Sequence, residues 1–146
     1  MVINIFKKKT KDVNSEKNLV LICALFVHAA KMDENYTNKE KSIILSALSE
    51  ISDKNESDLK IILKEAEEKE SQSNQILEFT KEVKNSEKNF RLKILEVLWK
   101  IIYSDGVSDM YESTLMRRLS GLLYVSDKET GDIKHSIINN KTTIHM

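Results

Sequence analysis

The sequence predicts an all-helical fold, and three observations support that prediction. The chain has no proline and only three glycines, so it lacks most of the residues that mark turns and strand ends. Leu, Ile, Lys, Glu, Ser and Asn dominate its composition and aromatic residues are few, which favours helices. Apolar residues also recur at helical spacing along the chain. With 146 residues, the protein has the size of one domain.

The first predicted helix runs from about Glu16 to Met32 and includes the run LVLICALFVHAA at residues 19–30. A helix that is apolar on nearly every face is expected to be buried. Residues 1–15 are expected to form a basic arm, which precedes a single domain at residues 16–140.

The next three predicted helices lie between residues 37 and 83. Thr37 and Glu40 have the spacing of a capping box, in which each side chain bonds the backbone of the other, and the helix continues to Ile51. Helices at 59–69 and 76–83 follow. We expect the charged run Lys64–Glu70 to be a solvated face with ion pairs at i,i+4 spacing.

Three further helices complete a prediction of about seven. Residues 92–103 are apolar on nearly every face and predict a central helix. A helix from Asp109 begins with a second capping-box pattern and carries an apolar stripe to Leu123. The last helix covers about Asp127 to Asn139, and residues 141–146 are expected to be a frayed tail.

The two halves of the chain resemble each other. Under one constant shift, Asp33 aligns with Asp105 and Glu40 with Glu112, and the apolar positions of the preceding helices align as well. Such an internal repeat predicts a duplicated unit with two pseudo-twofold-related halves.

The repeated acidic turns are the candidate site. Their oxygen-bearing side chains are candidate ligands for a weak Ca²⁺ or Mg²⁺ site: Asp33, Glu40, Asp105, Asp109 and Glu112. The second turn also matches the back part of an EF-hand loop. The front of that loop is missing, so one turn cannot complete the shell, whereas two turns facing each other could. The alternative is that these acids only stabilise helix ends and turns.

Composition and cysteine content limit the other function classes. Equal counts of basic and acidic residues, 23 of each, give no global attraction to nucleic acid. The single cysteine, Cys23, lies in an apolar run and is expected to be an inert hydrophobic residue in the cytoplasm.

The run 19–30 is too short for a membrane span, and a cleaved signal is disfavoured because the pattern recurs later. Contact of the Lys7–Lys11 arm with acidic lipid or a partner stays open.

No familiar catalytic motif is present. His28, His135 and His145 share no ligand spacing, and His28 is expected to be a core histidine with its hydrogen bonds satisfied. The pair Arg117-Arg118 is expected to form ion pairs with nearby acids, with an anion contact as the alternative. An enzyme that uses Asp105 and Glu112 is the alternative, and we expect a protein that is not an enzyme.

The chain resembles the TerB-like family, which includes the tellurite-resistance TerB domain and the N-terminal region of DjlA-type co-chaperones. The resemblance rests on the repeated segments HAAKMDENYTNKE and WKIIYSDGVSDMYE, and it covers about Leu19 to Lys134. An uncharacterised bacterial subgroup shares an ordered set of further positions: Glu65-Ala66-Glu67, Phe79-Thr80, Arg91, Leu98-Trp99, Ser104-Asp105-Gly106, Tyr111-Glu112 and Arg117-Arg118.

The resemblance implies an all-helical fold of about seven helices in two related halves, with an acidic cation-binding site. It implies that this site contains Asp33, Glu40, Asp105 and Glu112. In the first acidic turn, however, Glu34 replaces the glycine of the family's Asp-Gly pair. The first hypothesis is therefore a non-enzymatic, stress-related protein with a weak divalent-cation site. The second is a co-chaperone-like interaction module for an unknown protein partner, in which the acids are only helix caps.

Overall fold

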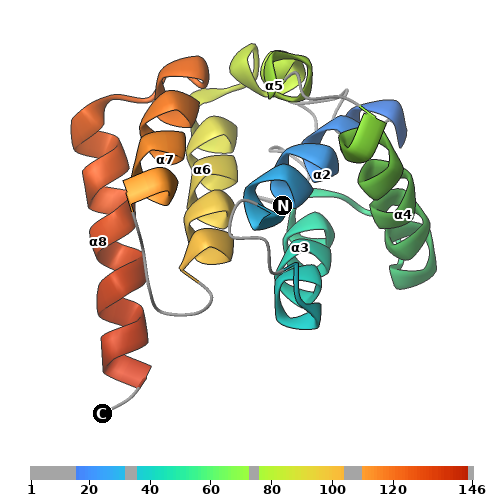
Figure 1. The fold of residues 1–146 in the computed structure, drawn as a ribbon, viewed down its shortest axis with the longest axis horizontal. Coiled ribbons are helices and arrows are strands. Elements are labelled where there is room, and N and C mark those ends of the chain that lie inside the picture. The colour runs from blue at the N-terminus through green and yellow to red at the C-terminus, as the bar shows by residue number, and fades with distance from the viewer. Residues whose placement is uncertain (1–15, 32–35, 73–75, 104–109, 145–146) are drawn as a thin grey trace.

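Seven α-helices build the part of the chain that the computed structural model describes, which is residues 16–31, 36–72, 76–103 and 110–144. No strand occurs in these residues, and the predicted all-α class with seven helices is confirmed (Figure 1). In chain order they are α2 (Glu16–Ala30), α3 (Asn38–Ile51), α4 (Glu56–Gln72), α5 (Ile76–Lys84), α6 (Lys88–Ile102), α7 (Met110–Leu122) and α8 (Asp127–Ile144).

Helix α2 is at the centre of the bundle and contacts α3, α4, α5 and α6. Its side chains from Leu19 to Val27 are all buried, as expected for a helix that is apolar on nearly every face. Helix α6 was expected to be central too, and it contacts α2, α3, α5, α7 and α8. Two buried helices therefore share the core, and every other described helix packs on at least one of them.

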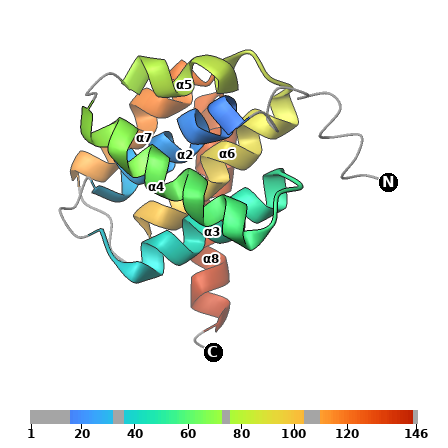
Figure 2. The same ribbon diagram turned by 90° about the vertical axis from the view of Figure 1, so that its right-hand side faces the viewer.

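The remaining helices surround this pair in a clear order. Helices α6, α7 and α8 lie side by side, α4 covers the opposite side of α2, and α5 lies across one end of the bundle against α2, α6 and α7 (Figures 1 and 2). The C-terminal part of α8 projects beyond the other helices at the end opposite α5. Helix α8 reaches Ile144, and the frayed tail expected for residues 141–146 stays a prediction.

The turn between α7 and α8 is stabilised by backbone hydrogen bonds and by a side chain from α6. The Val125 amide donates to the Ser120 carbonyl at 2.9 Å and the Tyr124 amide donates to the Gly121 carbonyl at 3.2 Å, which is a Schellman motif. The Arg91 guanidinium donates to the carbonyls of Leu123 and Tyr124, each at 3.0 Å. The end of α7 is thereby attached to the start of α6.

Two predictions concern the whole fold, namely the lack of a membrane-spanning segment and a twofold relation between the halves of the chain. Within the described residues, no helix is long and apolar enough to cross a membrane. The arrangement of the helices does not show the pseudo-twofold relation between the two halves, which stays a prediction from the sequence.

Candidate functional site

Glu40, the one candidate ligand whose side chain the structure describes, lies in a capping box at the start of α3. The Thr37 amide donates to Glu40 Oε1 at 2.8 Å, and the Glu40 amide donates to Thr37 Oγ1 at 3.3 Å. Thr37 Oγ1 also donates to Glu40 Oε1 at 3.2 Å. Glu40 is only 3% exposed, so the carboxylate is enclosed at the helix end that it stabilises. The predicted capping box is confirmed.

The other candidate ligands are not placed. Asp33, Asp105 and Asp109 lie outside the described residues, and Glu112 lies in α7 at a position whose side chain is not described. The convergence of the two acidic turns therefore stays a prediction. In the described part of the chain, no group of three or more His, Cys, Asp or Glu side chains could hold a metal ion.

A polar cluster that the sequence did not predict lies where the start of α3 meets α4. The Tyr36 hydroxyl donates to Glu67 Oε2 at 2.6 Å, and Lys41 Nζ lies 3.6 Å from the same oxygen. Lys41 Nζ also lies 5.0 Å from the centre of the Tyr36 ring. Burial, followed by the hydrogen bond to Glu67, raises the pKa of the Tyr36 phenol, so this hydroxyl remains a donor at neutral pH.

A second acid of α4 pairs with side chains at and just beyond the end of α2. Glu70 binds His28 Nδ1 at 3.2 Å and Lys31 Nζ at 3.0 Å, and its side chain is only 12% exposed. His28 has a partner, as expected, but it lies at the edge of the core with its side chain 22% exposed.

The prediction that Lys64–Glu70 forms a solvated face is wrong for Glu67 and Glu70. Glu70 continues the stripe of Leu59, Leu63 and Ala66, all of which are buried. An acid at a stripe position was the available sequence signal, because a side chain on that face must find a polar partner when it is covered.

Cys23 is fully buried in α2, and burial raises the pKa of its thiol. A protonated thiol without solvent access is not a nucleophile. The prediction of a small, inert hydrophobic residue agrees with this environment.

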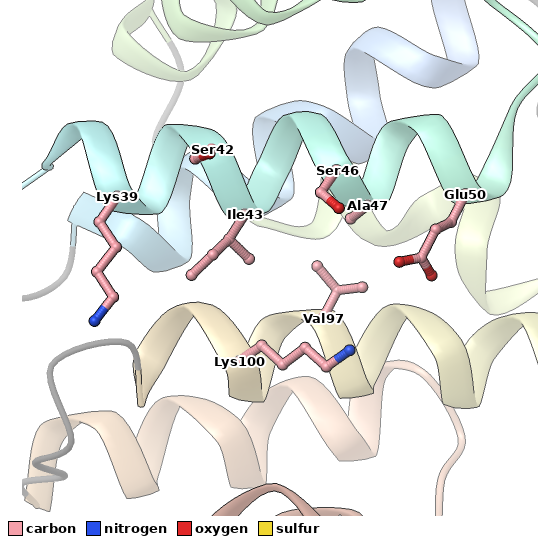
Figure 3. Close-up of a pocket in the computed structure, with 8 residues that line it drawn as sticks. All are labelled: Lys39, Ser42, Ile43, Ser46, Ala47, Glu50, Val97 and Lys100. Carbon is pink, nitrogen blue, oxygen red and sulfur yellow. The ribbon is translucent and has the colours of Figure 1, made fainter. Parts of the chain in front are cut away.

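A groove of about 350 Å³ lies between α3 and α6 (Figure 3). Ile43 and Ala47 of α3 and Val97 of α6 form its apolar floor. Figure 3 shows Lys39 and Glu50 at its two ends, with the side chain of Lys100 between them. An apolar floor bounded by charges of both signs is suited to an amphipathic segment of a protein.

Within the described residues, Arg117 and Arg118 do not form the expected ion pairs, and the acids nearest to them in the sequence, Asp109 and Glu112, have no described side chain. Both side chains are exposed, and neither takes part in an ion pair within the described residues. Beyond the end of the same helix, Tyr124 is 65% exposed and has a positive φ of 57°. Tyr124 was not predicted as a functional residue, whereas an anion contact was the alternative prediction for Arg117 and Arg118.

Comparison with known proteins identifies one family. The model of the family described as "Tellurite resistance protein TerB" matches residues 20–135, which includes all of α3 to α7. No curated protein and no solved structure matches the chain.

Proposed function

The chain belongs to the TerB family, and from this membership we propose that it is a non-enzymatic helical protein that acts by binding a protein partner. The proposed compartment is the cytoplasm, and the proposed role is stress-related, of the kind that the family description names. In this proposal the acids of the first turn serve the fold, and the outer surfaces of the helices serve the partner.

The observation that carries the proposal is the environment of Glu40. Its carboxylate accepts from the Thr37 amide and hydroxyl through Oε1 and is 3% exposed, so the acid has a role in the fold that requires no cation. Loss of an N-terminal cap costs about 1 kcal/mol. The α3–α6 groove, with its apolar floor of Ile43, Ala47 and Val97, supports the assignment of the surface to protein contacts.

Two substitutions at Glu40 separate a cap from a cation ligand. Glu40→Gln keeps an oxygen that accepts from Thr37 but removes the charge, so a capping role predicts stability close to that of the wild type. Glu40→Ala removes the acceptor and is expected to lose about 1 kcal/mol of unfolding free energy. Thermal unfolding of chelator-treated protein, with and without Ca²⁺ and Mg²⁺, measures both effects. If the wild type showed a cation-induced rise in the melting midpoint that Glu40→Gln lost, a role as a cap alone would be wrong for Glu40.

A divalent-cation site at the second acidic turn is the second candidate, because Asp105, Asp109 and Glu112 repeat the spacing of an EF-hand loop's back part. A cation at 100 times its Kd adds about 2.7 kcal/mol to the unfolding free energy. The same thermal scan therefore tests it with Asp105→Asn and Glu112→Gln. A rise in the midpoint that both variants abolish supports the site, and no rise with either cation removes the candidate.

Reconstitution with purified proteins tests the interaction role. The full chain is tagged and purified from its host, and each protein enriched with it is then produced separately and titrated against the pure chain. The proposal expects one-to-one binding with a Kd of about 1 μM or tighter, corresponding to about 8 kcal/mol. Binding that persists in chelator supports a function without metal, whereas failure of every enriched protein to bind the pure chain contradicts the interaction role.

A further inference from the structure

The outward side of α7 carries an unusual set of exposed residues. Helical spacing places Thr114, Arg117, Arg118 and Gly121 on one side, and Tyr124 follows at the end of the helix. All five are exposed, whereas the opposite side is buried through Leu115, Met116, Leu119 and Leu123. We call the five exposed residues the α7 outer face.

Arginine is rare in this chain, and two of its three arginines lie on this face. Arg91, the third, stabilises the end of α7 through the carbonyls of Leu123 and Tyr124. The ion pairs found within the described residues use lysines or His28, and Arg117 and Arg118 take part in none. Two adjacent guanidinium groups thus have no acidic partner in the described part of the chain, and arginine can bind a carboxylate through two parallel hydrogen bonds.

Gly121 and Tyr124 on the same face are both unfavourable for the fold. A Cβ added at Gly121 would meet no atom within 4 Å, so packing inside the chain does not require a glycine, and glycine in a helix is less stable than alanine. Tyr124 has a φ of 57°, a conformation that glycine adopts without strain. Within the described residues, the phenol of Tyr124 makes no hydrogen bond, ion pair or ring contact that would compensate. Two residues on one face that cost stability and gain no contact within the described residues point to a role for this face other than folding.

We propose that the α7 outer face binds an acidic segment of a partner protein, an inference that rests on the interaction role proposed above. Arg117 and Arg118 pair with carboxylates of that segment. The missing side chain at Gly121 lets the backbone of the acidic segment approach the helix, and the ring of Tyr124 packs against apolar atoms of that segment. Arginine and tyrosine are also the residue types that contribute most often to binding energy at protein interfaces.

The charge pattern favours a protein segment over nucleic acid or a membrane surface. Binding to the phosphate backbone commonly uses several basic contacts, and polybasic lipid-binding segments carry four to eight basic residues. The α7 outer face has two, in a chain whose 23 basic and 23 acidic residues balance. Two guanidinium groups match a short segment with a few carboxylates.

The test uses the full chain and a fluorescein-labelled peptide of alternating glutamate and leucine, with the same peptide carrying glutamine as the neutral control. Binding is measured by fluorescence anisotropy, and the position by NMR. The NMR spectra follow the Nε–H signals of the three arginines. Arg91, which lies outside the α7 outer face, is the internal reference. The expected result is that the glutamate peptide binds, the glutamine peptide does not, and the signals of Arg117 and Arg118 shift while that of Arg91 does not.

Four variants locate the binding energy. Arg117→Gln and Arg118→Gln are each expected to weaken binding about tenfold, the effect of losing one charge-assisted contact. Gly121→Ala and Tyr124→Gly are expected to weaken it severalfold although neither destabilises the fold, which separates a binding role from a folding role. A matched double variant, Lys64→Gln with Lys81→Gln, removes two exposed charges from α4 and α5 and is expected to leave binding unchanged.

Three results would overturn the α7 assignment. The first is that the glutamate peptide does not bind. The second is that the wild type and the arginine variants bind it equally well. The third is that duplex DNA or phosphatidylserine vesicles shift the Arg117 and Arg118 signals more than the glutamate peptide does. The reconstitution experiment does not depend on this face. A failed peptide titration with a successful reconstitution therefore rejects the α7 outer face alone, and failure of both rejects the interaction role as well.

Discussion

Tyr124 shows how a single residue can be poorly suited to its backbone and still have well-satisfied neighbours. It is the second residue after helix α7, where a left-handed conformation lets the amides of Tyr124 and Val125 reach back to the helix. A Cβ in that conformation costs about 1–2 kcal/mol. The buried side chain of Val125 and the hydrogen bonds from Arg91 hold the turn in place against this strain.

Tyr124→Gly is therefore expected to raise the free energy of unfolding by about 0.5–1 kcal/mol, since relief of the strain exceeds the added entropy of the unfolded chain. Tyr124→Ala is the control, because it removes the ring and keeps the Cβ. Urea unfolding followed by circular dichroism measures all three proteins. Equal stability of the Gly and Ala variants would show that the ring, and not the backbone conformation, determines the effect.

At the scale of the element, the beginning of α8 combines a helix cap with a bond between helices. Ser126 and Glu129 bond each other's backbone amides in a second capping box, at 3.1 Å and 3.3 Å. Glu129 also pairs with Lys88 at the start of α6, at 2.7 Å. The hydrogen bond from Lys88, followed by those from Ser126, lowers the pKa of Glu129 from 4.5 to about 2. The charged form of this residue therefore favours the folded state.

The sign of the resulting pH dependence follows from this lowered pKa. The contribution of Glu129 is fully present above pH 4.5 and is lost as the pH falls toward 2, because the unfolded chain takes up the proton first. We expect the stability difference between the wild type and Glu129→Gln to shrink across this window. Urea unfolding at several pH values measures it, with Glu65→Gln on the exposed side of α4 as the control. A difference that stays constant from pH 4.5 to 2 would contradict the prediction.

At the scale of the whole molecule, α2 connects the parts of the bundle. It contacts α3, α4, α5 and α6, and Cys23 in its middle is fully buried. Since these helices cover α2 from several sides, local opening of one of them is not expected to expose the thiol. Cys23 is also the only cysteine in the chain, so its reaction with a thiol reagent reports on the core alone.

We expect Cys23 to react only through global unfolding. The free energy obtained from its labelling rate in low urea should equal the free energy of unfolding from circular dichroism. Ser42→Cys in a Cys23→Ala background is the control, because this exposed position of α3 should react at the rate of a free thiol. Labelling of Cys23 well above the rate of global unfolding would mean that the bundle opens locally around α2.

Local sequence determined much of this protein. The seven helices, the burial of α2 and α6 and the Thr37–Glu40 capping box were all predictable, because propensity, apolar spacing and caps act within a few neighbouring residues. Only the tertiary structure decided that Glu67 and Glu70 reach Tyr36 and His28, since those contacts depend on how α4 packs against α2 and α3. The exposure of Arg117 and Arg118, and the lack of an ion pair for either among the described residues, likewise depend on which acids the fold brings near them, and distance along the chain does not encode that.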